Sequence, residues 1–135
     1  MTQEIGFDTL QIHAGARPDP ATGARQVPIY QTTAYVFRDA DHAAALFNLQ
    51  EVGYIYSRLT NPTIAALGER LAALEGGQGA ICTSSGHAAQ LMALYPLMGP
   101  GKNIVSSTRL YGGTITQFTQ VFKRFGWSTH FVDTE

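Results

Sequence analysis

The sequence has 135 residues and a formal net charge of −1, so it is long enough for a domain with a buried core and carries no basic face. That balance excludes the surfaces typical of nucleic-acid and anionic-membrane binding, and we expect neither partner. Hydrophobic residues make up 44% and charged residues 14%, which favours a surface that more chain or another subunit covers. The single cysteine, Cys82, excludes an internal disulfide and favours a cytoplasmic setting. The first residues have no secretion-signal pattern, and no apolar run has the length of a transmembrane helix.

The first part of the chain predicts an arm with little regular structure and few helix signals. Residues 17–23 are rich in turn formers, and residues 28–37 are β-branched and aromatic, which is typical of an extended segment. Because so long an arm rarely stands alone, we expect it to lie across another surface; the alternative is a frayed terminus. We therefore predict that residues 1–60 form an extended N-terminal arm that contacts a partner subunit.

Two helices are expected before residue 77. Asp39 or Asp41 is a suitable N-cap for a short helix that ends near Phe47. Asn61 followed by Pro62 is a strong helix start, with the asparagine as N-cap and the proline at the first helical position. Apolar residues then recur at helical spacing, at Ile64, Leu67, Leu71 and Leu74, until the Gly76-Gly77 pair ends the helix. Between the two helices, residues 54–58 have a strand-like composition.

From residue 62 onward, helices and strands alternate. After the helix that begins at Pro62, we expect a short buried strand, a helix that is apolar nearly all round and therefore covered, a second strand, a third helix and a third strand. Their expected ranges are residues 79–83, 86–98, 103–106, 115–125 and 127–132. This order predicts an α/β fold with a parallel sheet and right-handed crossovers. The last strand ends close to residue 135, so the sheet appears in this sequence as the incomplete first part of an α/β domain, residues 61–135.

A small polar turn, residues 83–87, lies between the first of these strands and the helix that follows it. Unpaired backbone N–H groups and the helix dipole favour an anion at such a position, and Gly86 allows the backbone to approach a phosphate closely. Ser85, Gly86 and His87 are therefore candidate phosphate-binding residues. The alternative is an ordinary Ser-Ser-Gly loop.

Three further side chains are candidates for the same chemistry. Arg58 suits a phosphate or carboxylate because its guanidinium makes planar, bidentate contacts; the alternative is a surface arginine paired with an acid. Tyr56 can add a hydroxyl to the same anion, and Tyr111, in a Tyr-Gly-Gly turn, can stack on a planar ligand; the alternative for each is a tyrosine with a packing role. Cys82 is expected to be a buried small hydrophobe. The four histidines show no metal-ligand spacing, so no metal site is expected; they are His13, His42, His87 and His130.

Taken together, these motifs resemble one family. In order along the chain they are Tyr56-Ser57-Arg58, Asn61-Pro62-Thr63, Leu74-Glu75-Gly76-Gly77, Ser85-Gly86-His87-Ala88-Ala89 and Leu110-Tyr111-Gly112-Gly113-Thr114. They have the order and spacing of the pyridoxal-phosphate-dependent enzymes of cysteine and methionine metabolism. The resemblance covers essentially the whole sequence, and as a set the motifs are highly specific.

The resemblance implies a fold-type I transferase, with an arm followed by the first part of the pyridoxal-phosphate-binding large domain. It implies that residues 85–87 bind the cofactor phosphate at the helix start. It also implies that Tyr56 and Arg58 reach the phosphate held by a neighbouring subunit of a homodimer or homotetramer, and that Tyr111 stacks on the pyridine ring and assists departure of the leaving group. The implied cofactor-binding set is Tyr56, Ser57, Arg58, Ser85, Gly86, His87 and Tyr111, with Tyr111 also catalytic.

Within the family, the sequence most resembles the O-acetylhomoserine sulfhydrylases, as residues 13–24 and 47–50 indicate. The resemblance implies replacement of the acyl group of an O-acylated homoserine by sulfide or a thiol, in methionine and cysteine biosynthesis. Gly113 stands where methionine gamma-lyases have cysteine, Tyr54 where sulfhydrylases often have asparagine, and His87 where methionine is commoner. The alternatives are a cystathionine gamma-synthase or gamma-lyase of the same family, or a non-catalytic chain that contributes half of a phosphate site.

Neither of the two lysines, Lys102 and Lys123, matches the family's Schiff-base lysine, which the resemblance places far downstream. We therefore expect this sequence to be an N-terminal piece that is inactive by itself.

Overall fold

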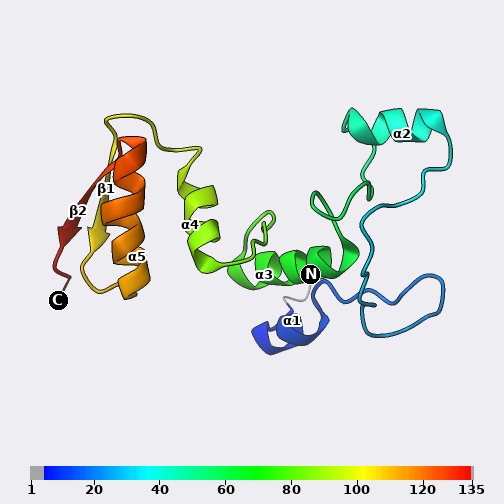
Figure 1. Cartoon of the computed structure of the whole chain (residues 1–135). Coiled ribbons are helices and arrows are strands. Elements are labelled where there is room, and N and C mark those ends of the chain that lie inside the picture. Colours follow the sequence, from blue (N-terminus) through cyan, green and yellow to red (C-terminus); the bar gives the residue numbers. More distant parts are fainter. Residues whose placement is uncertain (1–4, 135) are drawn as a thin grey trace. The chain divides into compact units, whose positions relative to one another are not determined.

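The computed structural model describes residues 5–134, which fall into two compact units, Met1–Cys82 and Thr83–Glu135 (Figure 1). The first unit contains three helices, α1 (Phe7–His13), α2 (Ala40–Phe47) and α3 (Pro62–Glu75). The second contains α4 (Gly86–Leu94), β1 (Asn103–Ser107), α5 (Gly112–Thr116), a π-helical turn η1 (Gln117–Val121), a 3-10 turn η2 (Phe122–Phe125) and β2 (Ser128–Val132). Among residues 5–134, no helix is both long and apolar enough to cross a membrane. The predicted division into residues 1–60 and 61–135 concerns contacts with another subunit and stays a prediction.

The two helices expected before residue 77 are confirmed, with their caps. The Asp39 carboxylate accepts a hydrogen bond from the backbone N–H of His42 at 2.7 Å and begins α2. The Asn61 side chain accepts one from the N–H of Thr63 at 2.9 Å and begins α3. Gly76, with φ of 66°, ends α3 in the left-handed conformation that favours glycine.

The expectation of an arm poor in helix was wrong for residues 7–13, which form α1. No side chain caps the start of this seven-residue helix. The Arg70 side chain, on α3, supports its other end by donating hydrogen bonds to the carbonyl oxygens of Ala14 at 2.9 Å and Ile12 at 3.2 Å. Short helices are marginal without tertiary contacts, so α1 depends on a residue that local sequence signals do not reveal.

The extended segment expected around residues 28–37 is present and lies along the residues before α3. The N–H of Tyr35 donates to the carbonyl of Ile55 at 3.2 Å, and the N–H of Ser57 donates to that of Thr33 at 2.8 Å. Ala34 and Tyr56 form an isolated antiparallel bridge. The predicted strand-like character of residues 54–58 therefore amounts to this one bridge.

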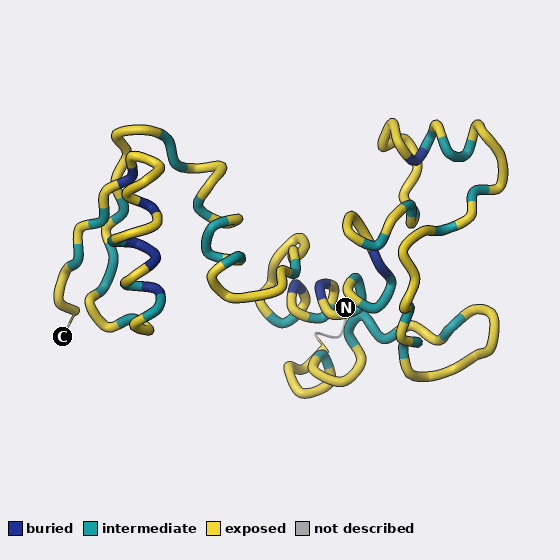
Figure 2. The backbone as a smooth tube through the Cα atoms, in the orientation of Figure 1, coloured by how far each residue is buried: buried dark blue, intermediate teal, exposed yellow. Residues whose placement is uncertain are grey.

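The second unit has a small parallel sheet and an aromatic core. Strands β1 and β2 pair in register from Asn103 opposite Ser128 to Ser107 opposite Val132, which confirms the predicted parallel pairing. The core consists of Phe118, Phe122 and Trp127, with Phe122 fully buried. Figure 2 shows the buried positions along the α5–η2 helical run. The expected third helix is therefore present, beginning at Gly112 and containing a π-helical turn.

Three expectations for the stretch between α3 and β1 were wrong: the strand over residues 79–83, the covered surface of the helix that follows it, and the extension of that helix to residue 98. Residues 79–83 form no strand, and Ile81 is 82% exposed, because a strand is held by its neighbours and only β1 and β2 pair within residues 5–134. Helix α4 ends at Leu94 and has no buried residue. The expected extension to residue 98 fails because Pro96 lacks the N–H that would continue the helix.

Candidate functional site

The start of α4 offers backbone donors. Ser85 is its N-cap: the side-chain oxygen accepts the N–H of Ala88 at 3.2 Å, and the carbonyl accepts that of Ala89 at 3.0 Å. The N–H groups of Gly86 and His87 have no hydrogen-bond partner in the described part of the chain. A Cβ on Gly86 would meet no atom within 4 Å, so the space beside this turn is open. Two free donors at the positive end of a helix dipole suit an anion such as a phosphate.

Tyr111 lies beside His87 in the same unit. The two ring centroids are 6.1 Å apart with an interplanar angle of 31°, and Tyr111 is 76% exposed. Gly113 makes this approach possible, because a Cβ there would lie 2.5 Å from Tyr111 Cε1 and 3.0 Å from two atoms of the His87 ring. An accessible aromatic face next to the donors of α4 fits a planar ligand that carries a phosphate.

Two buried polar residues of the α5–η1 run, Thr114 and Gln117, form hydrogen bonds to α4. Sequence reasoning missed both. Gln117 is 8% exposed and donates from Nε2 to the carbonyl oxygen of His87 at 2.9 Å. Gln90 donates from Nε2 to Thr114 Oγ1 at 2.9 Å, and Thr114 is also buried. The sequence did offer one signal for these residues: Thr114 and Gln117 are polar and lie three positions apart, and Gln117 directly precedes the buried Phe118. These bonds fix the turn that carries the free donors.

Tyr56 and Arg58 lie in the other unit, Met1–Cys82. The Arg58 guanidinium carbon is 5.3 Å from the centroid of the Tyr56 ring, a cation–π distance. Arg58 is exposed and forms no ion pair with any acid among residues 5–134, so the alternative of a surface ion pair finds no support there. The structure thus brings Tyr56 and Arg58 together, and separately His87 and Tyr111.

Ser57, between them, has both its hydroxyl and its backbone N–H occupied by hydrogen bonds. Its hydroxyl donates to the carbonyl oxygen of Thr32, accepts from Asn61 Nδ2 at 3.0 Å and lies 3.3 Å from the Tyr35 hydroxyl. Its backbone N–H is bound to Thr33. A serine hydroxyl has one donor and two acceptor positions, so this environment makes Ser57 a support for its neighbours.

A groove of about 750 Å³ lies beside this segment, between residues 57–61, α3 and residues 77–82. Gly68, inside α3, allows the passing chain to come close, since a Cβ there would lie 3.1 Å from the carbonyl oxygen of Ala80. Cys82 is partly buried at its edge, with a free thiol. Its expected place in the middle of a buried strand is not observed.

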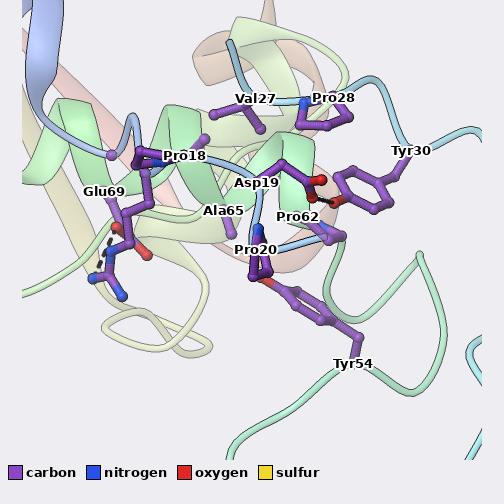
Figure 3. A pocket seen from close by; sticks show the side chains of 13 residues that line it. Pro18, Asp19, Pro20, Val27, Pro28, Tyr30, Tyr54, Pro62, Ala65 and Glu69 are labelled. Carbon is purple, nitrogen blue, oxygen red and sulfur yellow. Dashed lines mark hydrogen bonds and ion pairs between the residues drawn. The ribbon is translucent and has the colours of Figure 1, made fainter. Parts of the chain in front are cut away.

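A second cavity of about 260 Å³ lies where residues 15–30 meet the start of α3 (Figure 3). In Figure 3 the Tyr30 hydroxyl points to Asp19, to which it donates at 3.2 Å. At the edge of this cavity, Arg17 pairs with Glu69 at 3.4 Å. Hydrogen bonds from the Thr22 hydroxyl and N–H lower the pKa of Asp19. Partial burial is the main cause that raises the pKa of Tyr30, and its hydrogen bond to Asp19 raises it further. Burial and then the Glu69 charge raise that of Tyr54, so both tyrosines stay neutral near pH 7.

Similarity to known proteins extends along nearly the whole sequence. O-acetyl-L-homoserine sulfhydrylase 1 of Thermus thermophilus is 57% identical over 129 residues, which cover 96% of this chain and 31% of that protein. The homocysteine synthase of Schizosaccharomyces pombe is 57% identical over 127 residues, covering 94% and 30%. This chain therefore spans less than a third of the length of these relatives.

A solved structure and a family match agree with them. The crystal structure of a Campylobacter jejuni protein described as an O-acetylhomoserine (thiol)-lyase, with N'-pyridoxyl-lysine-5'-monophosphate, superposes with a TM-score of 0.88. It is 46% identical, and the match covers 96% of this chain and 32% of that one. The family described as Cys/Met metabolism PLP-dependent enzymes matches residues 8–135. With its motifs, its parallel strand pair and this match over nearly all of its residues, the chain belongs to the Cys/Met metabolism PLP-dependent enzyme family.

Proposed function

We propose that this chain is the N-terminal part of a pyridoxal-phosphate-dependent homoserine sulfhydrylase of methionine and cysteine biosynthesis. The full enzyme converts an O-acylated homoserine and sulfide, or a thiol, into homocysteine or its thioether and the free carboxylic acid. The observation that carries the proposal is the start of α4, where the free N–H groups of Gly86 and His87 lie in the same unit as the exposed ring of Tyr111. The names of the relatives at 57% identity support the choice of reaction.

Each proposed role follows from the groups that the residues present. The N–H groups of Gly86 and His87 hold the phosphate, with Ser85 fixing the turn, and the Tyr111 ring covers one face of the cofactor. The cofactor, when bound, supplies an electron sink for carbanions on the amino-acid substrate. In this proposal the Tyr111 hydroxyl assists the departing acyl group by proton transfer, and the exposure of its side chain supports that role.

Tyr56 and Arg58 complete the site from a second copy of the chain in a homodimer or homotetramer. The Arg58 guanidinium is exposed and has no acid partner among residues 5–134, and it adds charge-assisted contacts to the neighbour's phosphate. Ser57, through its hydrogen bonds, holds the backbone next to Arg58. This assembly also fits the low charged content of 14% and the extended arm over residues 1–60. The proposed setting is cytoplasmic, as a chain with one cysteine suits a reducing compartment.

The reaction is tested with the full-length enzyme and purified pyridoxal 5'-phosphate. We expect homocysteine and acetate from O-acetylhomoserine and sulfide, at a higher kcat/KM than cystathionine from the same substrate and cysteine. We expect no turnover by the 135-residue chain alone. Preferred cystathionine formation would indicate a cystathionine gamma-synthase, and keto-acid release without sulfide would indicate a gamma-lyase.

The site is tested by Arg58→Ala in the full-length enzyme. Removing a charge-assisted contact worth roughly 1.5–3 kcal/mol is expected to weaken pyridoxal phosphate binding about 10- to 150-fold, as measured by equilibrium dialysis. Arg38→Ala is the matched control, because Arg38 is an exposed arginine whose guanidinium pairs with Glu51 at 3.1 Å. Equal affinity of Arg58→Ala and Arg38→Ala would remove Arg58 from the site.

A further inference from the structure

Asn61 is a buried polar side chain of the Met1–Cys82 unit with three hydrogen bonds. It is 8% exposed. Its Oδ1 accepts the N–H of Thr63 at 2.9 Å, while Nδ2 donates to the carbonyl oxygen of Tyr30 at 2.9 Å and to Ser57 Oγ at 3.0 Å. Two of these three partners are backbone groups whose donor or acceptor character cannot change, so the orientation of the amide is determined.

These bonds link three pieces of chain, one of which, at Tyr30, lies 31 positions from Asn61 in the sequence. The Oδ1 bond caps α3, and the Nδ2 bonds reach the extended segment at Tyr30 and the Tyr56–Arg58 segment at Ser57. Thr63 strengthens the same junction, because its hydroxyl donates to the carbonyl oxygen of Pro28 at 3.0 Å and accepts the N–H of Tyr30 at 2.9 Å. N-capping requires only the acceptor oxygen, so the two donated bonds are a separate role of this side chain.

We propose that Asn61 is a positioning residue, whose buried amide holds Ser57 and thereby fixes the backbone from which Tyr56 and Arg58 reach a phosphate. This inference rests on the proposed function. Tyr56 and Arg58 are exposed, and Ser57 holds the backbone between them through its N–H, bound to Thr33, and its hydroxyl, bound to Thr32 and Asn61. The Tyr56 carbonyl oxygen makes only local bonds, accepting the N–H groups of Leu59 at 2.8 Å and Thr60 at 3.1 Å. Without the Asn61 donor, the hydroxyl loses its bond to a buried side chain. The guanidinium would then have to be ordered at the moment of binding, at the expense of affinity.

The substitution Asn61→Asp separates the two roles of the amide. A carboxylate keeps the acceptor for Thr63, and aspartate is as good an N-cap as asparagine, but it has no N–H for Tyr30 or Ser57. Asn103→Asp makes the same chemical change at an exposed position in the other unit. Asn61→Ser is the second variant in case the buried carboxylate prevents folding, because serine also caps helices and is too short to reach both acceptors.

The measurement is the dissociation constant of pyridoxal 5'-phosphate for the full-length apoenzyme, by equilibrium dialysis, with thermal unfolding of the apoenzyme as the folding check. We expect Asn61→Asp and Asn61→Ser to weaken binding about tenfold, comparable to partial loss of a charge-assisted contact, and Asn103→Asp to have no effect. In a Tyr56→Phe/Arg58→Ala background, we expect the same Asn61 changes to alter the dissociation constant less than about twofold.

The outcomes are distinct. Non-additive loss supports the proposal, since a general loss of stability would weaken binding equally in both backgrounds. Equal loss in both backgrounds overturns it. Unchanged binding by the folded Asn61 variants, with binding weakened by Arg58→Ala, overturns the role of Asn61 and leaves the proposed function intact. Unchanged binding by Arg58→Ala overturns both.

Discussion

The two units of this chain are held together by different forces. The Thr83–Glu135 unit has an aromatic core in which Phe122 stacks on Phe118, at a centroid distance of 5.1 Å, and meets Trp127 edge to face, at 5.0 Å. Among residues 5–82 of the Met1–Cys82 unit the buried residues are few, and one of them is polar: Leu46, Asn61, Gly68 and Ala72. Its segments are joined by caps and by hydrogen bonds between side chains and backbone, as at Asn61 and Arg70. We therefore expect loss of an aromatic core side chain to be the most damaging change in the second unit, and loss of polar contacts to be the most damaging in the first.

The largest effect is expected from the aromatic core. Phe122→Ala removes a fully buried ring and should destabilise the Thr83–Glu135 unit by about 3–5 kcal/mol. Hydrogen exchange of the β1 and β2 amides measures this loss locally. Phe125→Ala is the matched control, because its ring is 42% exposed and its removal should cost much less. Equal protection in the two variants would mean that the core does not hold the sheet.

A cap in the other unit comes next. Asp39→Ala removes the acceptor for the N–H of His42 and is expected to destabilise α2 by about 0.5–2 kcal/mol. Faster hydrogen exchange should be confined to α2, with α3 and its Asn61 cap unchanged. Faster exchange throughout Met1–Cys82 would show that the unit is more cooperative than its sparse burial suggests.

Crowding at the candidate site gives a smaller effect. Gly113→Ala is expected to displace the Tyr111 ring, because the new Cβ would lie 2.5 Å from its Cε1 atom. Losing one aromatic stacking contact, worth about 0.5–1.5 kcal/mol, should weaken pyridoxal phosphate binding about 2- to 10-fold in the full-length enzyme. Gly112→Ala is the control, since a Cβ there meets nothing within 4 Å. Identical affinities would place Tyr111 away from the cofactor.

The smallest effect is a pH dependence of the loop around Asp19. Its folded-state pKa lies below the ordinary 3.8, so its hydrogen bonds with Thr22 stabilise the loop above that pH and are lost as the pH falls through the lowered value. An NMR titration of the Asp19 carboxyl should give a midpoint below 3.8, and Asp19→Asn should remove the accompanying shifts at Thr22. A midpoint at or above 3.8 would contradict the assignment.

The features predicted correctly from the sequence are those whose physical cause lies within a few residues. Asp39 and Asn61 cap helices through N–H groups two or three residues away, and Gly76 ends α3 through its own backbone. Pro96 was an equally local signal, and overlooking it made the predicted α4 too long.

The features that were missed depend on distant partners. Helix α1 is supported by Arg70, which is 58 positions from Ile12, and residues 79–83 have no strand to pair with among those described. The motif residues of the candidate site could be named from the sequence, but the residues that hold them in place by hydrogen bonds could not. Gln117 contacts the carbonyl of His87 from 30 positions away, and Asn61 reaches Tyr30 across 31.

Pro62, at the first turn of α3, also affects the chemical ageing of the site. Asparagine deamidates spontaneously when the backbone nitrogen of the next residue loses its proton and attacks the side-chain amide carbon, which expels ammonia and forms a succinimide that water opens to a carboxylate. Proline has no N–H, so Asn61 cannot age by this route, whereas Asn48 and Asn103 are followed by leucine and isoleucine and can. Deamidation would turn Asn61 into the carboxylate that lacks both donated bonds. The residue that starts the helix thus also protects the amide over the lifetime of the protein.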